Sequence, residues 1–416
     1  MEAEVSHPAF QNWIGAPRAF RDDVLRYSLC GFSLSPLEDM LVEANRTLKR
    51  NKAFDDGRVQ GRIVAAMDGI EILSSYSRCC DACLERRVSV RQGGVKVERL
   101  QYYHRAVACQ IVSSPVKAVL AMEWLQPGET EDAAALRLLH KLPELYGSRF
   151  FDILLLDALY AQAPVLQCAD EHGWDLVISL KRNRPELYAS AVRLFAHRPA
   201  DLEFTERLSG KTYQGQIWDT PGLPLAAADS RLVRVVRSEE KLTQNHYRRG
   251  EIQAETTDHE WMWITTLDRQ AFPPKVVRDL GHARWKQENN GWTDLTQNWA
   301  LKHGFLHACR HRPRAATTEN QSQPADSEVT EEDSTVAPQQ VEKHDQLIPN
   351  HGLAAIVLIL VLAFTLCAAF IHCHSKLVRL HHFSGIEVAR QLRISVSKLP
   401  PRIRAPDSPA PQSSTT

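Results

Sequence analysis

Three acidic residues, far apart in the chain, stand in settings that suit phosphoryl transfer assisted by two metal ions. Asp68 and Asp157 each follow a short, continuous apolar run, which is typical of a strand buried on both faces. Glu288 lies in a segment with the composition of a helix. In open α/β sheets, sites form at the carboxyl ends of strands. Two carboxylates there, facing a third, could hold two divalent cations about 4 Å apart across a scissile phosphate.

Each acid also has an ordinary structural interpretation. An Asp after an apolar run is often a turn residue or the N-cap of the next helix, and Asp68-Gly69 is a common turn dipeptide. Glu288 could belong to a solvated helix face, paired with Arg284 one turn earlier. Spacing alone leaves both interpretations open.

Six sequence blocks between Phe10 and His307 surround these acids and add a more specific signal. They are RIVAAMDGIE (62–71), SRCCDACLERRV (77–88), YYHRAVACQIV (102–112), PGETEDAAALRLLHKL (127–142), LLLDALYAQAPVLQCADEHGWDLVISLKRN (154–183) and RWKQENNGWTDLTQNWALKHGFLH (284–307). In this order the blocks resemble the DDE transposases of bacterial insertion sequences. The resemblance is to the IS-four-like group, which carries a β-rich insertion between the second Asp and the Glu.

The resemblance implies a function, a cofactor and partners. Asp68, Asp157 and Glu288 would be the catalytic and metal-binding triad of a DNA transposase, with two Mg²⁺ (or Mn²⁺) ions. The activity would be metal-dependent DNA strand cleavage and strand transfer, which moves an insertion sequence. The partners would be double-stranded DNA, both the terminal inverted repeats of the element and the target, and a second copy of the chain in a synaptic homodimer.

Two positions depart from the signature of this group around its Glu. Arg284 and Glu288 match, but Gly281 stands where the group has Tyr, and Leu295 where it has Lys or Arg. The departure affects the expected DNA contacts of this helix more than its metal binding. The candidate DNA-binding residues are Arg284, Lys181, Asn183, Arg248 and Arg249.

The periodicity predicts an α/β fold with a mixed sheet flanked by helices, and the resemblance implies that this sheet is ribonuclease-H-like. A helical N-terminal region (1–60) that could contact DNA precedes the first part of the catalytic core (61–181), and a β-rich insertion (182–270) follows. A core helix with Glu288 (271–312), a disordered acidic linker (313–350), an apolar C-terminal helix and extension (351–397) and a disordered tail (398–416) complete the chain. Within the core we expect strands at 62–67, 103–112, 117–124, 151–157 and 174–180, and helices at 129–146 and 161–172.

The insertion is rich in basic residues with aromatic residues between them. Tyr213, Trp218, His246 and Tyr247 could stack on unpaired bases, although core packing is the more common role for each of them taken singly. In the resembling group, an aromatic residue of the insertion can hold a base that is flipped out of a DNA hairpin.

Charge and cysteine content set further limits. Lys+Arg and Asp+Glu are both 50, but residues 317–346 hold eight acids and one Lys. The rest of the chain therefore carries 49 basic against 42 acidic residues, which permits DNA binding without demonstrating it. Nine Cys and the lack of a signal peptide predict a reducing cytoplasm, in a bacterium and on the nucleoid when DNA is bound.

Cys80-x-x-Cys83 is half of a zinc ribbon, and His104 or Cys109 could complete it. Because no second pair of ligands follows at ribbon spacing, the sequence favours free thiols packed beside the first strand, and we predict no structural metal.

The nineteen uncharged residues Leu353–Ile371 could cross a membrane by length and hydropathy. His351, His372 and His374 flank them in place of Lys or Arg, and aromatic belts are missing. A helix packed behind the sheet is the preferred interpretation, and no membrane partner is expected. Two alternatives to an active transposase stay open: a catalytically inactive DNA-binding derivative, and a membrane-tethered protein.

Overall fold

The computed structural model describes residues 11, 22–208, 210–228, 230–248, 251–302, 307, 351–374 and 387–388. The predicted linker (313–350), the predicted tail (398–416) and Arg249 lie outside these residues, as does most of the extension after the apolar helix.

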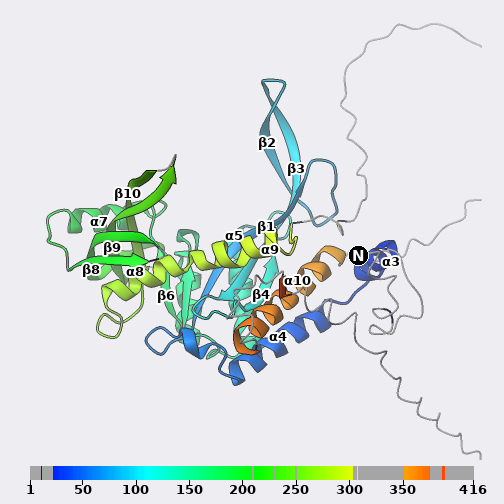
Figure 1. The fold of residues 1–416 in the computed structure, drawn as a ribbon, viewed down its shortest axis with the longest axis horizontal. Coiled ribbons are helices and arrows are strands. Elements are labelled where there is room, and N and C mark those ends of the chain that lie inside the picture. The colour runs from blue at the N-terminus through cyan, green and yellow to red at the C-terminus, as the bar shows by residue number, and fades with distance from the viewer. Residues whose placement is uncertain are drawn as a thin grey trace, which may run out of the picture.

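One mixed ten-stranded sheet runs through the molecule (Figure 1). Its strands are β1 (Val64–Ser75), β2 (Leu84–Gln92), β3 (Val95–Ile111), β4 (Val119–Trp124), β5 (Ile153–Leu156), β6 (Asp175–Ser179), β7 (Leu202–Leu208), β8 (Lys211–Leu225), β9 (Arg231–Arg248) and β10 (Glu251–Thr265). The central order is β4-β3-β1-β5-β6, in which β1, β3 and β4 are antiparallel and β1, β5 and β6 are parallel. Beyond β6, the antiparallel strands β10, β9, β8 and β7 extend the same sheet.

The five predicted core strands are all present, but two are longer than their apolar runs. β1 continues past Asp68 to Ser75, and β3 begins eight residues before position 103. The extra length of β3 pairs with β2, which the sequence did not predict. Together they form a hairpin, here called the arm (residues 84–103), that projects from the body of the molecule (Figure 1). Its outer part, residues 91–100, is exposed, so the alternation of Val95 and Val97 with charged residues does not mark a buried face.

Both faces of the central strands are covered by helices. Ala65 and Met67 of β1 belong to the cluster that includes α5 (Glu131–Tyr146) and α6 (Ala163–His172). Val64 and Ala66 point the other way, into a cluster with α8 (Pro274–Ala283). This alternation follows from the pleat and places Asp68 on the α8 face. Both α5 and α6 lie close to their predicted bounds.

Two regions differ from the prediction in secondary structure. The predicted β-rich insertion begins with a helix, α7 (Pro185–Phe195), before its four strands. The predicted helix that carries Glu288 is present but distorted: α8 ends at Ala283, the backbone stays helical at Arg284 and Lys286, a π-helical stretch η4 covers Gln287–Trp292, and α9 covers Thr293–Gln297. π-Helical turns occur frequently at functional sites and have no simple sequence signature.

The apolar C-terminal helix α10 (Gly352–Ala369) lies beside α4 (Ser35–Arg50) and α3 (Asp22–Cys30) (Figure 1). Val357 and Val361 are fully buried there in a cluster that also contains Leu41 of α4 and Leu295 of α9. Gly352–Cys373 is long and apolar enough to span a membrane by length and composition, and half of its most apolar stretch is buried within the protein. α3 and α4 also place two helices in the predicted helical N-terminal region.

Candidate functional site

Asp68 and Asp157 lie side by side on neighbouring parallel strands. The last pair in the β1–β5 register is Met67 with Leu156. Asp68 and Asp157 are the residues that directly follow this pair in the sequence. Since adjacent strands lie about 4.8 Å apart, the two carboxylates start from positions that one cation can bridge. Asp68 lies inside β1, whereas Asp157 follows the end of β5 and precedes the 3-10 turn η2 (Ala158–Tyr160).

The π-helical continuation of α8 brings Glu288 to the same place. Nη1 of Arg284 donates to Oδ2 of Asp68 at 2.5 Å and to Oε1 of Glu288 at 3.0 Å. Arg284 is buried, with 8% of its side chain exposed, while 47% of the Glu288 side chain is exposed. The structure therefore links Asp68 and Glu288 through one guanidinium, and the β1–β5 register places Asp157 beside Asp68.

The two Asp side chains have opposite electrostatic environments. Burial, the largest cause, and the neighbouring Glu288 raise the pKa of Asp68, Arg284 opposes them, and the net result is a pKa of about 7. Burial also acts to raise the pKa of Asp157, but the hydrogen bond from Lys181 and the charges of Lys181 and Arg284 outweigh it and lower that pKa. An added cation near Asp68 would favour its ionised form.

The candidate DNA-binding residues near Asp157 make different contacts. Nζ of Lys181 donates to Oδ1 of Asp157 at 2.8 Å, and 57% of the Lys181 side chain is exposed. The side-chain amide of Asn183 donates to the carbonyl of Ala158, which fixes the turn after Asp157. The structure thus gives Asn183 a positioning contact beside the site. Of Arg248 only the backbone, at the end of β9, is described.

The two departures from the family signature have structural explanations. A Cβ on Gly281 would lie 2.1 Å from the indole Nε1 of Trp263, so a side chain there would displace the indole. Leu295 is fully buried in the cluster with α10 and cannot contact DNA. Both positions therefore serve packing.

An aromatic pocket of about 270 Å³ opens beside the carboxylates, between the insertion and α8. Trp261 and Trp285 meet edge to face with their ring centroids 4.7 Å apart, and His282 packs against both rings. Lys181 and Arg284 line the same pocket, which connects it to the carboxylates. Sequence reasoning missed this pocket, although the run EWMWITTL and the neighbouring Trp285 contain its aromatic residues.

The aromatic residues that the sequence suggested for base stacking do not line this pocket where their side chains are described. Trp218 is buried and its indole N–H donates to the carbonyl of Arg198 at 2.9 Å, which is a packing role. Tyr213 is half-buried near the guanidinium of Arg278. The side chains of His246 and Tyr247 lie outside the described residues.

A further acid borders the site. A Cβ on Gly69 would lie 2.6 Å from the Glu131 carboxylate, so the glycine allows this side chain to approach β1. Glu131 accepts a hydrogen bond from the Tyr160 hydroxyl at 2.8 Å and pairs with Arg105 at 2.5 Å. Its place in the block 127–142 was visible in the sequence, but nothing in the spacing connected it to Asp68.

The residues present fit divalent cations such as Mg²⁺. Carboxylate oxygens are the hard ligands that this ion prefers. The guanidinium already placed between Asp68 and Glu288 shows that a positive charge is accommodated there. Asp68, Asp157 and Glu288 are the residues that could hold such ions.

Comparison with known proteins adds little to this geometry. No family model matches the chain, and no curated protein matches it. Among solved structures, the chain is similar to the piggyBac transposase in a synaptic complex with hairpin DNA, at 9% identity and a TM-score of 0.34. The match covers 80% of this chain and 52% of that one, so the chain spans about half the length of the transposase that it matches.

Proposed function

We propose that this protein is a DDE-type DNA transposase, a metal-dependent enzyme that cleaves DNA strands and joins them to a target. One observation carries the proposal: Asp68 and Asp157 are adjacent on parallel strands, and Glu288 reaches Asp68 through the shared Arg284. The order β4-β3-β1-β5-β6, with an acid on its first and fourth strands in chain order, is consistent with a ribonuclease-H-like core. The series of blocks that resembles the bacterial DDE transposases supports the same assignment.

The proposed cofactor is a pair of Mg²⁺ or Mn²⁺ ions held by the three acids. When bound, two such ions can activate an attacking water or 3′-hydroxyl and stabilise the leaving oxygen. In this proposal Asp68 would contribute to both ions. Asp157 is kept ionised by Lys181 and can contribute to one of them, and the exposed Glu288 can complete the other.

The basic residues of the site orient the acids and the DNA. Arg284 fixes Asp68 relative to Glu288, and its guanidinium can turn to a phosphate oxygen when cations enter. Lys181 is exposed enough to leave Asp157 for a phosphate of the strand. In the synaptic complex we expect a homodimer that holds the terminal repeats and the target.

The aromatic pocket is a candidate site for an unpaired base. Its Trp rings offer stacking faces, and Lys181 and Arg182 at its rim can hold the adjoining phosphate. The Trp261/Trp285 pair takes the role that the resemblance assigns to an aromatic residue of the insertion.

DNA cleavage by conservative variants tests the proposal. Wild-type protein with Mg²⁺ and DNA that carries the element's own ends should nick that DNA, and Asp68→Asn, Asp157→Asn and Glu288→Gln should each abolish nicking. Glu203→Gln, which changes an acid on β7 of the insertion, is the matched control and should nick normally. Gel retardation should persist in all variants, because DNA contacts come from other residues.

The outcomes separate the alternatives. Nicking at the wild-type rate by any of the three variants would exclude that residue as a metal ligand. A wild-type protein that binds these ends with Mg²⁺ or Mn²⁺ present but never nicks them would instead be a non-catalytic DNA-binding derivative.

A further inference from the structure

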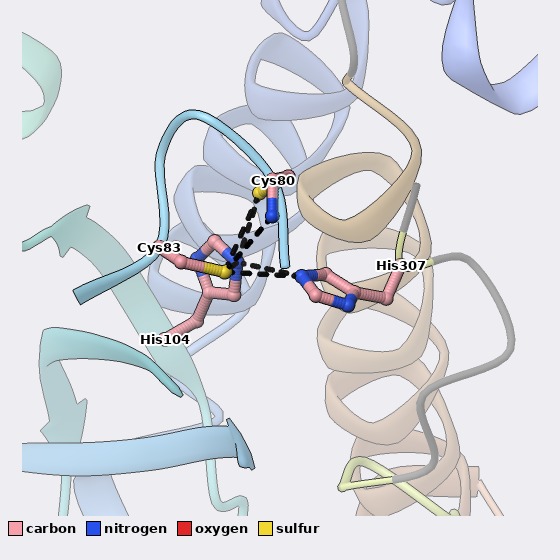
Figure 2. Close-up of side chains that lie close together, drawn as sticks. All are labelled: Cys80, Cys83, His104 and His307. Atoms are coloured by element: carbon pink, nitrogen blue, oxygen red, sulfur yellow. Dashed lines mark hydrogen bonds between the residues drawn. The ribbon is translucent and has the colours of Figure 1, made fainter. Parts of the chain in front are cut away.

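Two cysteines and two histidines from three distant parts of the chain converge at the root of the arm (Figure 2). Cys80 and Cys83 precede β2, His104 lies on β3, and His307 comes from the chain beyond α9. Cys83 and His307 are separated by 224 positions in sequence. The four ligand atoms all lie within 4.8 Å of one another.

The spacing of these atoms matches the edges of a tetrahedron around zinc. With Zn–S of about 2.3 Å and Zn–N of about 2.05 Å, the edges are about 3.8 Å for S···S, 3.6 Å for S···N and 3.4 Å for N···N. The two Sγ atoms are 3.7 Å apart, and the two Nε2 atoms are 3.3 Å apart. The Sγ of Cys83 lies 3.3 Å from His104 and 3.2 Å from His307, and the Sγ of Cys80 lies 3.3 Å from His104.

The backbone around the cysteines supports thiolate ligands. The N–H of Cys83 donates to the carbonyl of Cys80 at 3.1 Å, which closes a turn, and the N–H of Cys80 points back to the Cys83 Sγ at 3.3 Å. An N–H donated to a sulfur stabilises its anionic form. Two thiolates and two neutral imidazoles cancel the charge of Zn²⁺, so the group can be buried without an unpaired charge.

Burial distinguishes this site from a catalytic zinc site. Cys83 and His104 are 7% exposed and His307 is 3% exposed, while Cys80 is half-buried and adjoins a surface pocket through which an ion can enter. Four protein ligands leave no position for water, which is the arrangement of a structural zinc site. His104 also packs edge to face on Trp124, which fixes its ring.

We propose that Cys80, Cys83, His104 and His307 bind one structural Zn²⁺ that joins the root of the arm to the chain beyond α9. On binding, both thiols lose their protons to solvent and each imidazole donates the lone pair of its Nε2. The expectation of free thiols from the sequence is thereby revised: His104 is one of the ligands, Cys109 is not, and His307 had no signal at ribbon spacing.

The consequence of the site concerns the arm. Residues 84–100 carry five basic side chains against two acidic ones, and their outer part is exposed. Among the described residues, the arm pairs with the body at its root, where the four ligands lie. Zinc would therefore fix the direction of a basic hairpin and tie it to the stretch of chain that also supplies Glu288.

Metal analysis of full-length protein tests the proposal without reference to DNA cleavage. Protein dialysed against metal-free buffer should retain one zinc per chain, and Cys83→Ser or His307→Ala should reduce zinc to background. Cys79→Ser, which changes the neighbouring thiol outside the cluster, is the matched control and should retain zinc. In cobalt-substituted protein the thiolate charge-transfer and tetrahedral ligand-field bands should appear for wild type and Cys79→Ser only.

A folding control keeps the test decisive. His307→Cys supplies a Cys₃His set and should restore zinc binding even if His307→Ala is poorly folded. A chelator should speed tryptic cleavage within the arm of wild-type protein and leave that of Cys83→Ser unchanged. Wild-type protein without zinc, a Cys80–Cys83 disulfide in protein purified anaerobically, or equal zinc loss in Cys79→Ser and Cys83→Ser would overturn the proposal.

Discussion

The carboxylate site and the thiol–imidazole cluster are assembled in similar ways but from opposite chemistry. The stretch of chain after α8 supplies Glu288 to the first and His307 to the second. At the first site the candidate ligands are hard oxygens, partly exposed and balanced by Arg284 and Lys181. At the second they are sulfur and nitrogen, mostly buried and matched in charge to a single ion. Solvent exposure of the ligands and the type of ligand atom together distinguish two kinds of metal site. Exposed oxygen ligands suit a site that exchanges its ions, and buried sulfur and nitrogen ligands suit one that retains its ion.

The largest expected effect is a clean separation of the two sites by mutation. Asp157→Asn should reduce DNA nicking at least about 1000-fold while zinc stays at one per chain, because it removes a cation ligand and leaves the cluster intact. Cys83→Ser should lose zinc. The measurements are single-turnover nicking and metal content on the same preparations, and loss of zinc in Asp157→Asn would show that the two regions are not independent.

The segment after α8, which supplies both Glu288 and His307, is supported by α10, because α10 packs against α9. Val361→Asp places a charge at a fully buried position and should destabilise the protein by about 3 kcal/mol or more. Leu366→Asp, on the same helix but 49% exposed, should cost less than about 1 kcal/mol. Urea unfolding gives both values.

The same helix allows a test of the membrane alternative. If α10 is a core helix, carbonate should extract the full-length protein from membranes without detergent. Extraction only by detergent, together with equal effects of the two α10 variants, would favour the membrane-tethered protein.

A buried ion-pair network fastens α8 to the insertion, and its effect should depend on pH. Burial acts to raise the pKa of Glu240, but His282 and Arg278 outweigh it and lower the pKa to about 2. The folded pKa lies below the unfolded value, so the stabilisation is present above about pH 4.5 and is lost as pH falls towards 2. Glu240→Gln should therefore cost about 3 kcal/mol at pH 7 and about half of that at pH 3.

Unfolding of the Glu240 variant at the two pH values checks this sign. Glu239→Gln, an exposed neighbour on the same strand, should show no such dependence. A cost of Glu240→Gln that grows as the pH falls would contradict the assigned cause.

The smallest effect concerns the aromatic pocket. Gly281→Ala forces Trp263 to move and should cost about 1–3 kcal/mol. In a Trp263→Leu background the same change should cost less, because the atoms that it would strike are gone. A double-mutant cycle measures this coupling, and strict additivity would show that the close approach does not constrain the pocket.

The sequence predicted what depends on local pattern. The apolar runs before Asp157 and Lys181 predicted β5 and β6, and the resemblance selected Asp68, Asp157 and Glu288 as the candidate site. Local sequence pattern did not predict the features that depend on residues distant in the chain or that lack a buried face. The outer part of the arm is exposed, the π-helical turn at Glu288 has no signature, and His307 joins cysteines more than 200 positions away.

Counting bound Mn²⁺ by electron paramagnetic resonance tests the central claim most directly, because this ion is visible and replaces Mg²⁺ at oxygen ligands. Zinc-loaded wild-type protein bound to DNA should take up two Mn²⁺ per chain, as should the Glu203→Gln control. Asp68→Asn, which changes the carboxylate common to both ions, should lose both while its zinc remains. Equal Mn²⁺ binding by Asp68→Asn and wild-type protein would contradict the account.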